Sequence, residues 1–225
     1  MGNIKAVIFD LDGTLIDTEK YYRINWPKAL KHFGYEMSEE QALFIRSLGK
    51  PFAVQTFKEW YGEDFDYETV REYRKKLMEA SLNENGIELK PGCVEIITFL
   101  RENGYITAIA TANDLERTKR YVKRIGLEGY FDRLISAHMV KEGKPSPDIY
   151  AFACEELGIA PDEAIAVEDS PNGVKSAYAA GCKVIMVPDQ TEPDEEISQM
   201  LYARADTLLD IKKYLQIFYK IKTRT

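Results

Sequence analysis

Two hydrophobic periodicities divide this chain of 225 residues. The run 6–9 is apolar at every position and stops at Asp10, which predicts a strand buried on both faces of a parallel sheet. From about residue 14 to residue 88 the spacing is helical instead, and the first helix has one apolar face made by Tyr22, Trp26, Leu30 and Phe33. Because no strand pattern interrupts this stretch, we expect a small helical bundle.

Further helices of the bundle are expected at about 39–47, 52–61 and 67–83. Ser38 and Gln41 form a capping-box signal at the start of the first of these, and Gly34 ends the helix that precedes it. We interpret the many aromatic residues of the bundle as its core, because aromatic stripes at helical spacing normally pack inside.

After Pro91 the pattern alternates between helix and strand. Strands are expected at 106–110, 133–136, 164–167 and 183–187, with a short one near Ala205. The helices that alternate with these strands have start signals at Pro91, Asn113, Ser146 and Ser170. Their stop signals are Gly104, Gly126, Gly158 and Gly181. A last helix is expected from about Leu209.

Strands that alternate with helices of this length pair in parallel and make right-handed crossovers. The predicted fold is therefore α/β, with a Rossmann-like parallel sheet core formed by residues 1–16 and 89–225. Residues 17–88 form a helical cap domain that is inserted directly after the first strand. Such an insertion lies over the carboxyl edge of the sheet, where open α/β sheets bind their ligands.

Composition narrows the classes of partner. The net charge of −7 argues against a nucleic-acid-binding face, and we read the basic tail as a solvated helix face (Lys212, Lys213, Lys220, Lys222 and Arg224). No apolar run approaches a membrane span of about 20 residues, and no signal peptide is apparent. The three dispersed cysteines favour reduced thiols and a cytoplasmic location (Cys93, Cys154 and Cys182).

Acidic residues follow two of the predicted strands. Asp10 and Asp12 end the first, and Glu168 and Asp169 end the strand at 164–167. Carboxylates held this close repel one another unless a proton or cation separates them, and oxygen ligands of this kind suit Mg²⁺. The pattern predicts a Mg²⁺ site at which Asp10 is both ligand and nucleophile, with the hydroxyl of Thr14 nearby.

Groups suited to an anion come to the same edge. Thr111 and Asn113 follow the strand at 106–110, where a helix begins with unpaired N–H groups. Lys144 lies between Gly143 and Pro145 in a polar loop, from which it can neutralise a carboxylate and a phosphoryl oxygen together. A cation site beside an anion site, with a carboxylate nucleophile, is the arrangement that phosphoryl transfer requires.

The same four segments resemble the haloacid dehalogenase superfamily. Its first motif corresponds to the run 10–14, the second to Thr111, the third to Lys144 in the run 143–148, and the fourth to Glu168 and Asp169. The likeness extends over nearly the whole chain, cap included, and is greatest to the subfamily of phosphoglycolate phosphatase and β-phosphoglucomutase.

This resemblance implies a role for each motif residue. Asp10 would attack phosphorus and form an aspartyl phosphate, and Asp12 would act as general acid and then as general base. The side chains of Thr111 and Lys144 and the amide of Ala112 would hold the phosphoryl group. Mg²⁺ would be held by Asp10, the main-chain carbonyl of Asp12, Glu168 and Asp169.

The expected function is thus hydrolysis of a small phosphorylated metabolite by a monomer or weak dimer. A hexose-phosphate mutase is the alternative: Thr18 agrees with that subgroup, but Tyr22 stands where it typically has His. The candidates for substrate specificity are Thr18, Tyr22, Lys50 and Asn113, of which Lys50 in the cap could hold a second anion. Two remoter alternatives are a receiver-type signalling module, which is normally about half this length, and a binding protein without catalytic activity.

Overall fold

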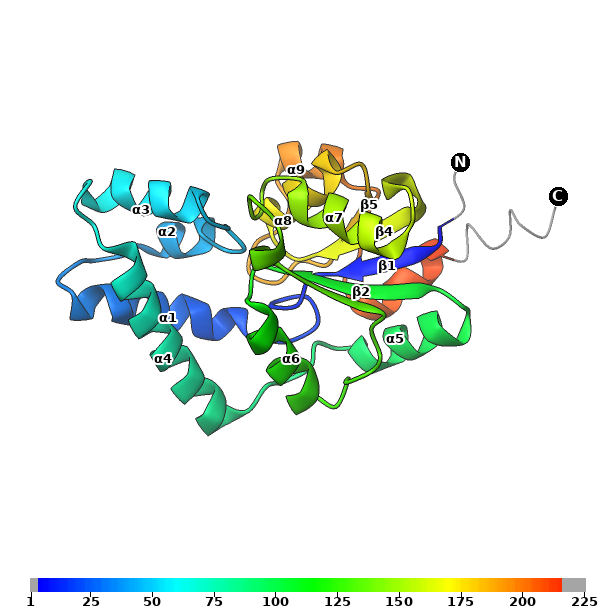
Figure 1. Ribbon diagram of the computed structural model, residues 1–225, viewed down its shortest axis with the longest axis horizontal. Helices are drawn as coiled ribbons and strands as arrows, with labels where there is room; N and C mark the ends of the chain where they lie inside the picture. Colours follow the sequence, from blue (N-terminus) through cyan, green and yellow to red (C-terminus); the bar gives the residue numbers. More distant parts are fainter. Residues whose placement is uncertain (1–3, 216–225) are drawn as a thin grey trace.

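The computed structural model describes residues 4–215 and shows six parallel strands in one sheet, in the order β3-β2-β1-β4-β5-β6 (Figure 1). The bounds of the strands are β1 Ala6–Phe9, β2 Ile106–Thr111, β3 Arg133–Ser136, β4 Ala164–Glu168, β5 Lys183–Met186 and β6 Ala203–Arg204. This confirms the predicted α/β fold and the strand that precedes Asp10.

Strand β1 lies at the centre of the sheet and is fully buried. It pairs with β2 through Ala6 and Ile106 and with β4 through Ala6 and Ala164, all in parallel register. Val7 and Phe9 face one hydrophobic cluster, whereas Ile8 faces the other. The continuous apolar run of the sequence therefore reflects a strand that is covered on both faces.

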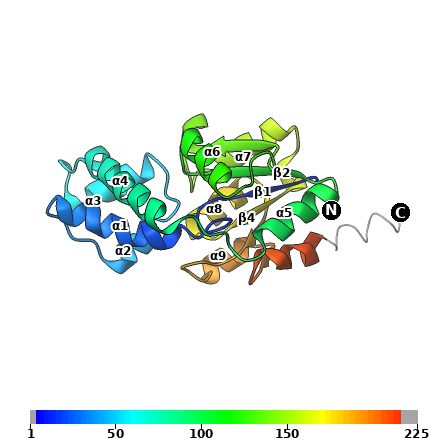
Figure 2. The ribbon, with the colours of Figure 1, turned by 90° about the horizontal axis from the view of Figure 1, so that it is seen from below.

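Helices cover both faces of the sheet (Figure 2). Residues of α5 and α6 belong to one hydrophobic cluster, and residues of α7, α8 and α9 belong to the other. The bounds of these helices are α5 Cys93–Glu102, α6 Leu115–Arg124, α7 Asp148–Leu157, α8 Pro171–Ala179 and α9 Glu195–Met200.

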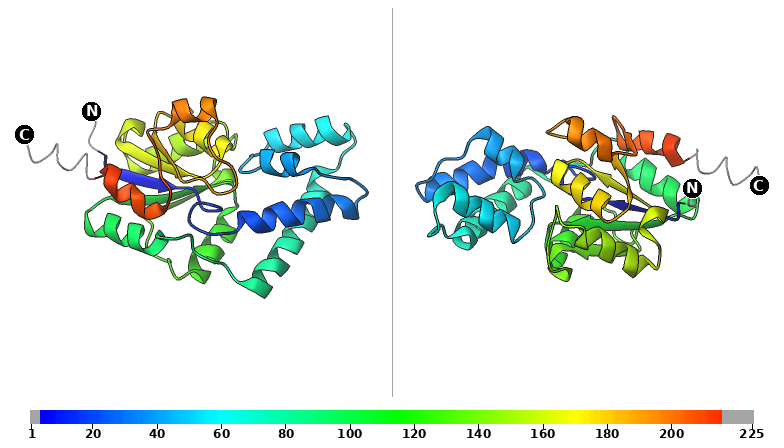
Figure 3. Two further views of the ribbon diagram at one scale, coloured as in Figure 1. Left: turned by 180° about the vertical axis from the view of Figure 1, so that it is seen from behind. Right: turned by 90° about the horizontal axis from the view of Figure 1, so that it is seen from above.

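Four other helices of the described residues lie beyond the carboxyl ends of the strands (Figures 1 and 3). They are α1 Glu19–His32, α2 Glu39–Phe44, α3 Phe52–Tyr61 and α4 Tyr67–Asn85. They have a hydrophobic cluster of their own, in which Phe57 is fully buried among the rings of Trp26, Phe65 and Tyr67. These aromatic residues form a core, as expected from their spacing.

The two connections between the helical bundle and the sheet run antiparallel beside each other. The N–H of Asp17 donates to the carbonyl of Glu88 at 2.9 Å, and that of Lys90 donates to the carbonyl of Leu15 at 2.9 Å. This pairing supports the predicted domain boundaries, between residues 16 and 17 and between residues 88 and 89. The division into domains stays a prediction.

Several element ends differ from those expected. The first short helix of the bundle ends at Phe44 rather than near residue 47. Helix α5 begins at Cys93 rather than at Pro91, because Gly92 has a φ of 84° and so cannot be the first helical residue. The N-cap of α6 is Asp114 and not Asn113: the Asp114 carboxylate accepts the N–H of Arg117 at 2.8 Å.

The last expected helix begins after a 3₁₀ turn at Leu208–Asp210, and Lys213 pairs there with Asp210 at 2.5 Å. The predicted basic face lies partly outside the described residues, since Lys220, Lys222 and Arg224 do. Within 4–215, every helix is too short or too polar to span a bilayer.

Candidate active site

Three buried carboxylates meet at the carboxyl edge of the sheet. Asp10 follows β1, Glu168 ends β4 and Asp169 comes next, and each is at most 2% exposed. One oxygen from each lies within 4.8 Å of the other two. The central position of β1, with β4 as its direct neighbour, is what brings together acids that are more than 150 residues apart in the chain.

Lys144 reaches this cluster from the loop before α7. Its ammonium group lies 2.5 Å from an oxygen of Asp10 and 2.6 Å from an oxygen of Glu168. The hydroxyl of Tyr150 donates to the same Glu168 oxygen at 2.5 Å, and the Tyr150 ring lies under the ammonium group. Lys144 is only 1% exposed, so its positive charge is used inside the protein, as the motif predicted.

One lysine does not balance three carboxylates. Burial raises the pKa of Asp10 well above its usual value, Lys144 opposes this rise, and the charges of Glu168 and Asp169 add to it. Burial also raises the pKa of Asp169 to about 7. Asp10 Oδ2 and Glu168 Oε2 are buried without a hydrogen-bond partner. Two free carboxylate oxygens beside a third acid fit a hard divalent cation.

The carboxylate of Asp12 is not part of this cluster. Its two oxygens accept from the hydroxyl of Thr18 and from the side-chain amide of Asn113, each at 2.5 Å. Burial raises the pKa of Asp12, and these two hydrogen bonds oppose the rise. Asp12 is therefore a fixed carboxyl group with a raised pKa, beside the cluster that holds Asp10.

Thr18 and Asn113 stay candidates for substrate specificity, and the structure places the side chains of both in hydrogen bonds with Asp12. Tyr22 supports this arrangement from the cap, because its hydroxyl lies 3.2 Å from the carbonyl oxygen of the Asn113 side chain. Asn113 can make these bonds because Asp114 caps the helix in its place.

Two of the residues predicted to hold phosphate, Thr111 and Ala112, line the same cavity as Asp10. Thr111 ends β2, Ala112 follows it, and the hydroxyl of Thr111 accepts the N–H of Asn113 at 3.2 Å. At the acidic cluster, the hydroxyl of Thr14 donates to Asp169 at 3.4 Å. Gly13 has a φ of 84° and leaves no room for a Cβ beside Asp169, so this turn requires glycine.

Two charged residues of the cap that the sequence did not single out complete the acidic edge. The guanidinium group of Arg46 forms an ion pair with Asp169, and its Nε donates to Glu19 at 3.2 Å. Both Arg46 and Glu19 are 5% exposed. Burial raises the pKa of Glu19 to about 8, although Arg46 opposes this shift. The cap thus contributes charge directly beside a candidate metal ligand.

The cap also touches the loop that carries Lys144. Gly49 donates its N–H to the carbonyl of Lys144 at 2.8 Å, and Gly143 donates to the carbonyl of Lys50 at 3.2 Å. A Cβ at Gly49 would lie 2.5 Å from the Cα of Gly143. The two glycines therefore allow cap and core backbones to meet at the site.

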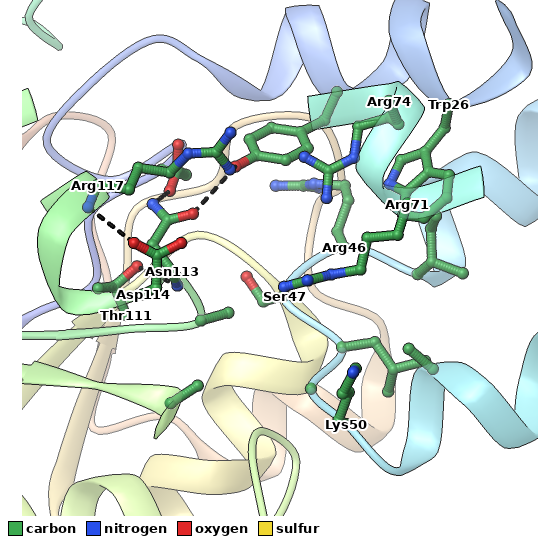
Figure 4. Close-up of a pocket in the computed structure, with 18 of the residues that line it drawn as sticks. Trp26, Arg46, Ser47, Lys50, Arg71, Arg74, Thr111, Asn113, Asp114 and Arg117 are labelled. Atoms are coloured by element: carbon green, nitrogen blue, oxygen red, sulfur yellow. Dashed lines mark hydrogen bonds between the residues drawn. The ribbon is translucent and has the colours of Figure 1, made fainter. Parts of the chain in front are cut away.

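The cavity continues under the cap, where α1 and α4 line it (Figure 4). Trp26, Arg71 and Arg74 lie on this side, and Asn113 and Arg117 lie on the core side. Lys50 lines the cavity as expected, but it forms an ion pair with Glu68 and its side chain is half exposed.

A protein-family model described as haloacid dehalogenase-like hydrolase matches residues 7–187. The chain belongs to this family. The match confirms the resemblance carried by the four motifs, and it makes the chain a hydrolase by family.

Individual relatives agree. The chain is 31% identical over 216 residues to the protein CbbY of Cereibacter sphaeroides, with 92% of each chain covered. It is 33% identical over 202 residues to hexitol phosphatase A of Escherichia coli, with 88% of this chain and 91% of the relative covered. A solved structure from Bacteroides vulgatus, provisionally assigned as a β-phosphoglucomutase, has a TM-score of 0.82 at 26% identity, covering 97% of this chain and 90% of that one.

The raised pKa of Asp169 predicts a pH dependence. With no cation bound, a folded-state pKa of about 7 stabilises the fold at low pH, and this contribution is lost as the pH rises through 7. A cation must displace the same proton, so its apparent Kd should fall about tenfold per pH unit up to pH 7. Thermal shift titrations with MgCl₂ and MnCl₂ at pH 6 and 8 measure this change, and an Asp169→Asn variant should lose most of it.

The contact between Gly49 and Gly143 predicts that Gly49→Ala hinders closure of the cap on the Lys144 loop. We expect kcat/KM to fall about tenfold or more, because small misplacements of catalytic groups are costly, while the melting temperature changes little. Steady-state kinetics on any accepted substrate would measure the loss. Unchanged kinetics in the folded variant would show that this contact is not required.

Proposed function

We propose that the chain is a Mg²⁺-dependent phosphatase that hydrolyses a small phosphorylated carbohydrate through an aspartyl-phosphate intermediate. The observation that carries the proposal is Lys144 lying between Asp10 and Glu168, with Asp169 beside them and two carboxylate oxygens unpaired. This arrangement offers a nucleophile, a cation site and a positive charge for a phosphoryl group at one point of the sheet edge.

In the first step an oxygen of Asp10 attacks phosphorus, and the bond from phosphorus to the substrate oxygen breaks. Asp12 donates a proton to that oxygen as it leaves, for which its raised pKa is suited. In the second step Asp12 takes a proton from a water molecule that attacks the phosphorus. Inorganic phosphate leaves, and the Asp10 carboxylate is restored.

Thr18 and Asn113 act through Asp12. Their hydrogen bonds to its two oxygens fix the direction of the carboxyl group. The bonds keep the group from rotating toward Asp10 or toward bulk water. In this proposal Tyr22 joins them through Asn113, so the cap takes part in holding the acid. They are positioning residues rather than direct substrate contacts.

The transferred phosphoryl group is held by the hydroxyl of Thr111, the amide of Ala112 and the ammonium group of Lys144. Mg²⁺ would be held by Asp10, the main-chain carbonyl of Asp12, Glu168 and Asp169. When bound, Mg²⁺ offsets the charge of the nucleophile and the phosphoryl oxygens. Lys144 supplies the remaining positive charge.

The substrate class follows from relatives and from the cavity. Hexitol phosphatase A acts on a hexitol phosphate by name, and another relative, from Thermotoga maritima and 30% identical over 186 residues, is a phosphorylated carbohydrates phosphatase. The cavity under the cap, which carries Arg71, Asn113 and Arg117 beside apolar side chains, suits a hydroxylated compound of this kind. We also propose that residues 17–88 form the cap domain and that the protein is cytoplasmic. It would act as a monomer or weak dimer and bind neither nucleic acid nor membrane.

A hexose-phosphate mutase is the second candidate, and the likeness to the Bacteroides vulgatus structure favours it. The hydroxyl of Tyr22 stands against it, because it is bound to Asn113 and has a pKa that burial raises to about 12. A group this weakly acidic does not transfer protons readily near neutral pH.

A phosphate-release screen tests the proposed function. We expect Mg²⁺-dependent release from one or more of a panel of sugar phosphates, polyol phosphates, phosphoglycolate and nucleoside monophosphates. The same screen with β-glucose 1-phosphate and a bisphosphate activator separates the candidates, because a mutase forms glucose 6-phosphate with little free phosphate. No release from any compound would contradict the phosphatase.

Asp10→Asn is the sharpest single substitution. It should abolish turnover, by about 10⁴-fold or more, because an amide cannot form the acyl phosphate. The fold should persist, since the amide keeps the shape of the side chain. Phosphate release and circular dichroism on the purified variant measure both outcomes, and retained turnover would overturn the mechanism.

A further inference from the structure

Arg46 joins the cap to a candidate metal ligand of the core. It lies in the loop between α2 and α3, and its guanidinium group is buried. This group forms an ion pair with Asp169, and its Nη1 donates to the hydroxyl of Thr191 at 3.1 Å. Its Nε donates to Glu19 of the cap at 3.2 Å. The mechanism proposed above does not use Arg46.

The loop that carries Arg46 is held in one conformation. The main-chain carbonyls of Phe44 and Arg46 both accept from the side-chain amide of Asn172 on α8, at 3.0 and 2.9 Å. The next residue, Ser47, has a φ of 55°, a left-handed conformation that residues other than glycine rarely adopt. Such strain persists where the surrounding contacts determine the conformation. Arg46 and Ser47 both line the cavity (Figure 4).

Both carboxylate oxygens of Asp169 accept hydrogen bonds. Oδ1 accepts from the hydroxyl of Thr14 at 3.4 Å, and Oδ2 accepts from Arg46. The first donor belongs to the loop after β1 and the second to the cap, so the direction of the carboxylate is fixed from two sides. A carboxylate oxygen has more than one lone pair, and these bonds therefore leave Asp169 able to bind a cation.

The charge balance shows that Arg46 does not take the place of the cation. The ion pairs of Arg46 and Lys144 belong to one network at the sheet edge. In the part of the chain that the structure describes, its five carboxylates are those of Asp10, Glu19, Glu168, Asp169 and Asp189, and its three cations are Arg46, Lys90 and Lys144. When all of them are ionised, two negative charges remain, which one divalent cation offsets.

We propose that Arg46 is a positioning residue of the metal site, which orients Asp169 for the cation while the cap lies against the core. The inference rests on the proposed function, because it takes the acidic cluster as the Mg²⁺ site. Groups that hydrogen-bond to a metal ligand orient that ligand and raise the affinity for the metal. Since Arg46 belongs to the cap, metal binding and the contact between cap and core favour each other.

A cation that merely neutralised the empty cluster would act in the opposite sense. It would compete with the metal for the same negative charge, so its removal would strengthen metal binding. A positioning residue strengthens binding, so its removal weakens it. The sign of the change in Kd therefore decides between the two roles.

The experiment measures the Kd for Mn²⁺, because the free ion can be followed by electron paramagnetic resonance without turnover, and calorimetry with MgCl₂ repeats it. We expect Arg46→Gln to raise the apparent Kd about 10- to 100-fold. Arg46→Lys keeps the charge but not the planar set of donors, and it should leave the Kd raised about tenfold. Arg23→Gln is the matched control: Arg23 is also a cap arginine, but it bonds to Gln190 and Glu39 rather than to a metal ligand, and the Kd should be unchanged.

A double variant provides a second test, because Arg46→Gln leaves the buried Glu19 without its guanidinium partner. Glu19→Gln combined with Arg46→Gln removes both members of this pair, which avoids an unpaired buried charge. We expect the Kd to rise by a similar factor in this variant. Circular dichroism checks that the fold is retained.

Hydrogen exchange, followed by NMR, tests the coupling to the cap. The N–H of Gly49 donates across to the carbonyl of Lys144 at 2.8 Å, so its exchange reports the contact between cap and core. MgCl₂ should slow this exchange about fivefold or more in the unsubstituted protein, and it should have no such effect in Arg46→Gln.

The outcomes separate this inference from the proposed function. An unchanged or lower Kd in Arg46→Gln, or full recovery in Arg46→Lys, would overturn the positioning role and leave the phosphatase standing. Exchange at Gly49 that does not respond to MgCl₂ would overturn the coupling to the cap. An unsubstituted protein that binds neither Mn²⁺ nor Mg²⁺ would contradict the metal site of the proposed function, and the inference with it.

Discussion

Charge balance at one point of the sheet edge is the constraint on which the rest of the site depends. Asp10, Glu168 and Asp169 are buried together, and such a cluster is unstable unless positive charge is supplied from close by. Lys144 supplies part of it from the core, and Arg46 supplies part from the cap. The negative charge that these two groups leave unbalanced favours a cation at this point of the sheet edge.

Much of this arrangement follows from local patterns in the sequence. The apolar run before Asp10 and the one before Glu168 define buried parallel strands, and parallel strands bring their carboxyl ends to one edge. Lys144 was identified through the run 143–148 and its place among these motifs, because a lysine in a polar loop is otherwise most often on the surface. Its complete burial depends on the packing of the loop before α7.

Part of the cap side of the site was beyond the reach of sequence patterns. Arg46 and Glu19 lie on or beside helices whose periodicity defines a core-facing side but not the direction in which a neighbouring polar residue points. Their roles arise when the bundle is set over the sheet edge. The N-cap of α6 was predicted wrongly at Asn113 for a similar reason. Asn113 and Asp114 both suit an N-cap, and only the tertiary contact of Asn113 with Asp12 shows that Asp114 is the cap.

The paired connections at Asp17 and Lys90 have an evolutionary consequence. The helical insertion leaves the sheet and returns to it at neighbouring points, and main-chain hydrogen bonds that any sequence can form hold these two points together. The place of the insertion relative to β1 is therefore set by the main chain, whereas its residues are free to vary except where they meet the site, as Arg46 does at Asp169 and Gly49 does at the Lys144 loop.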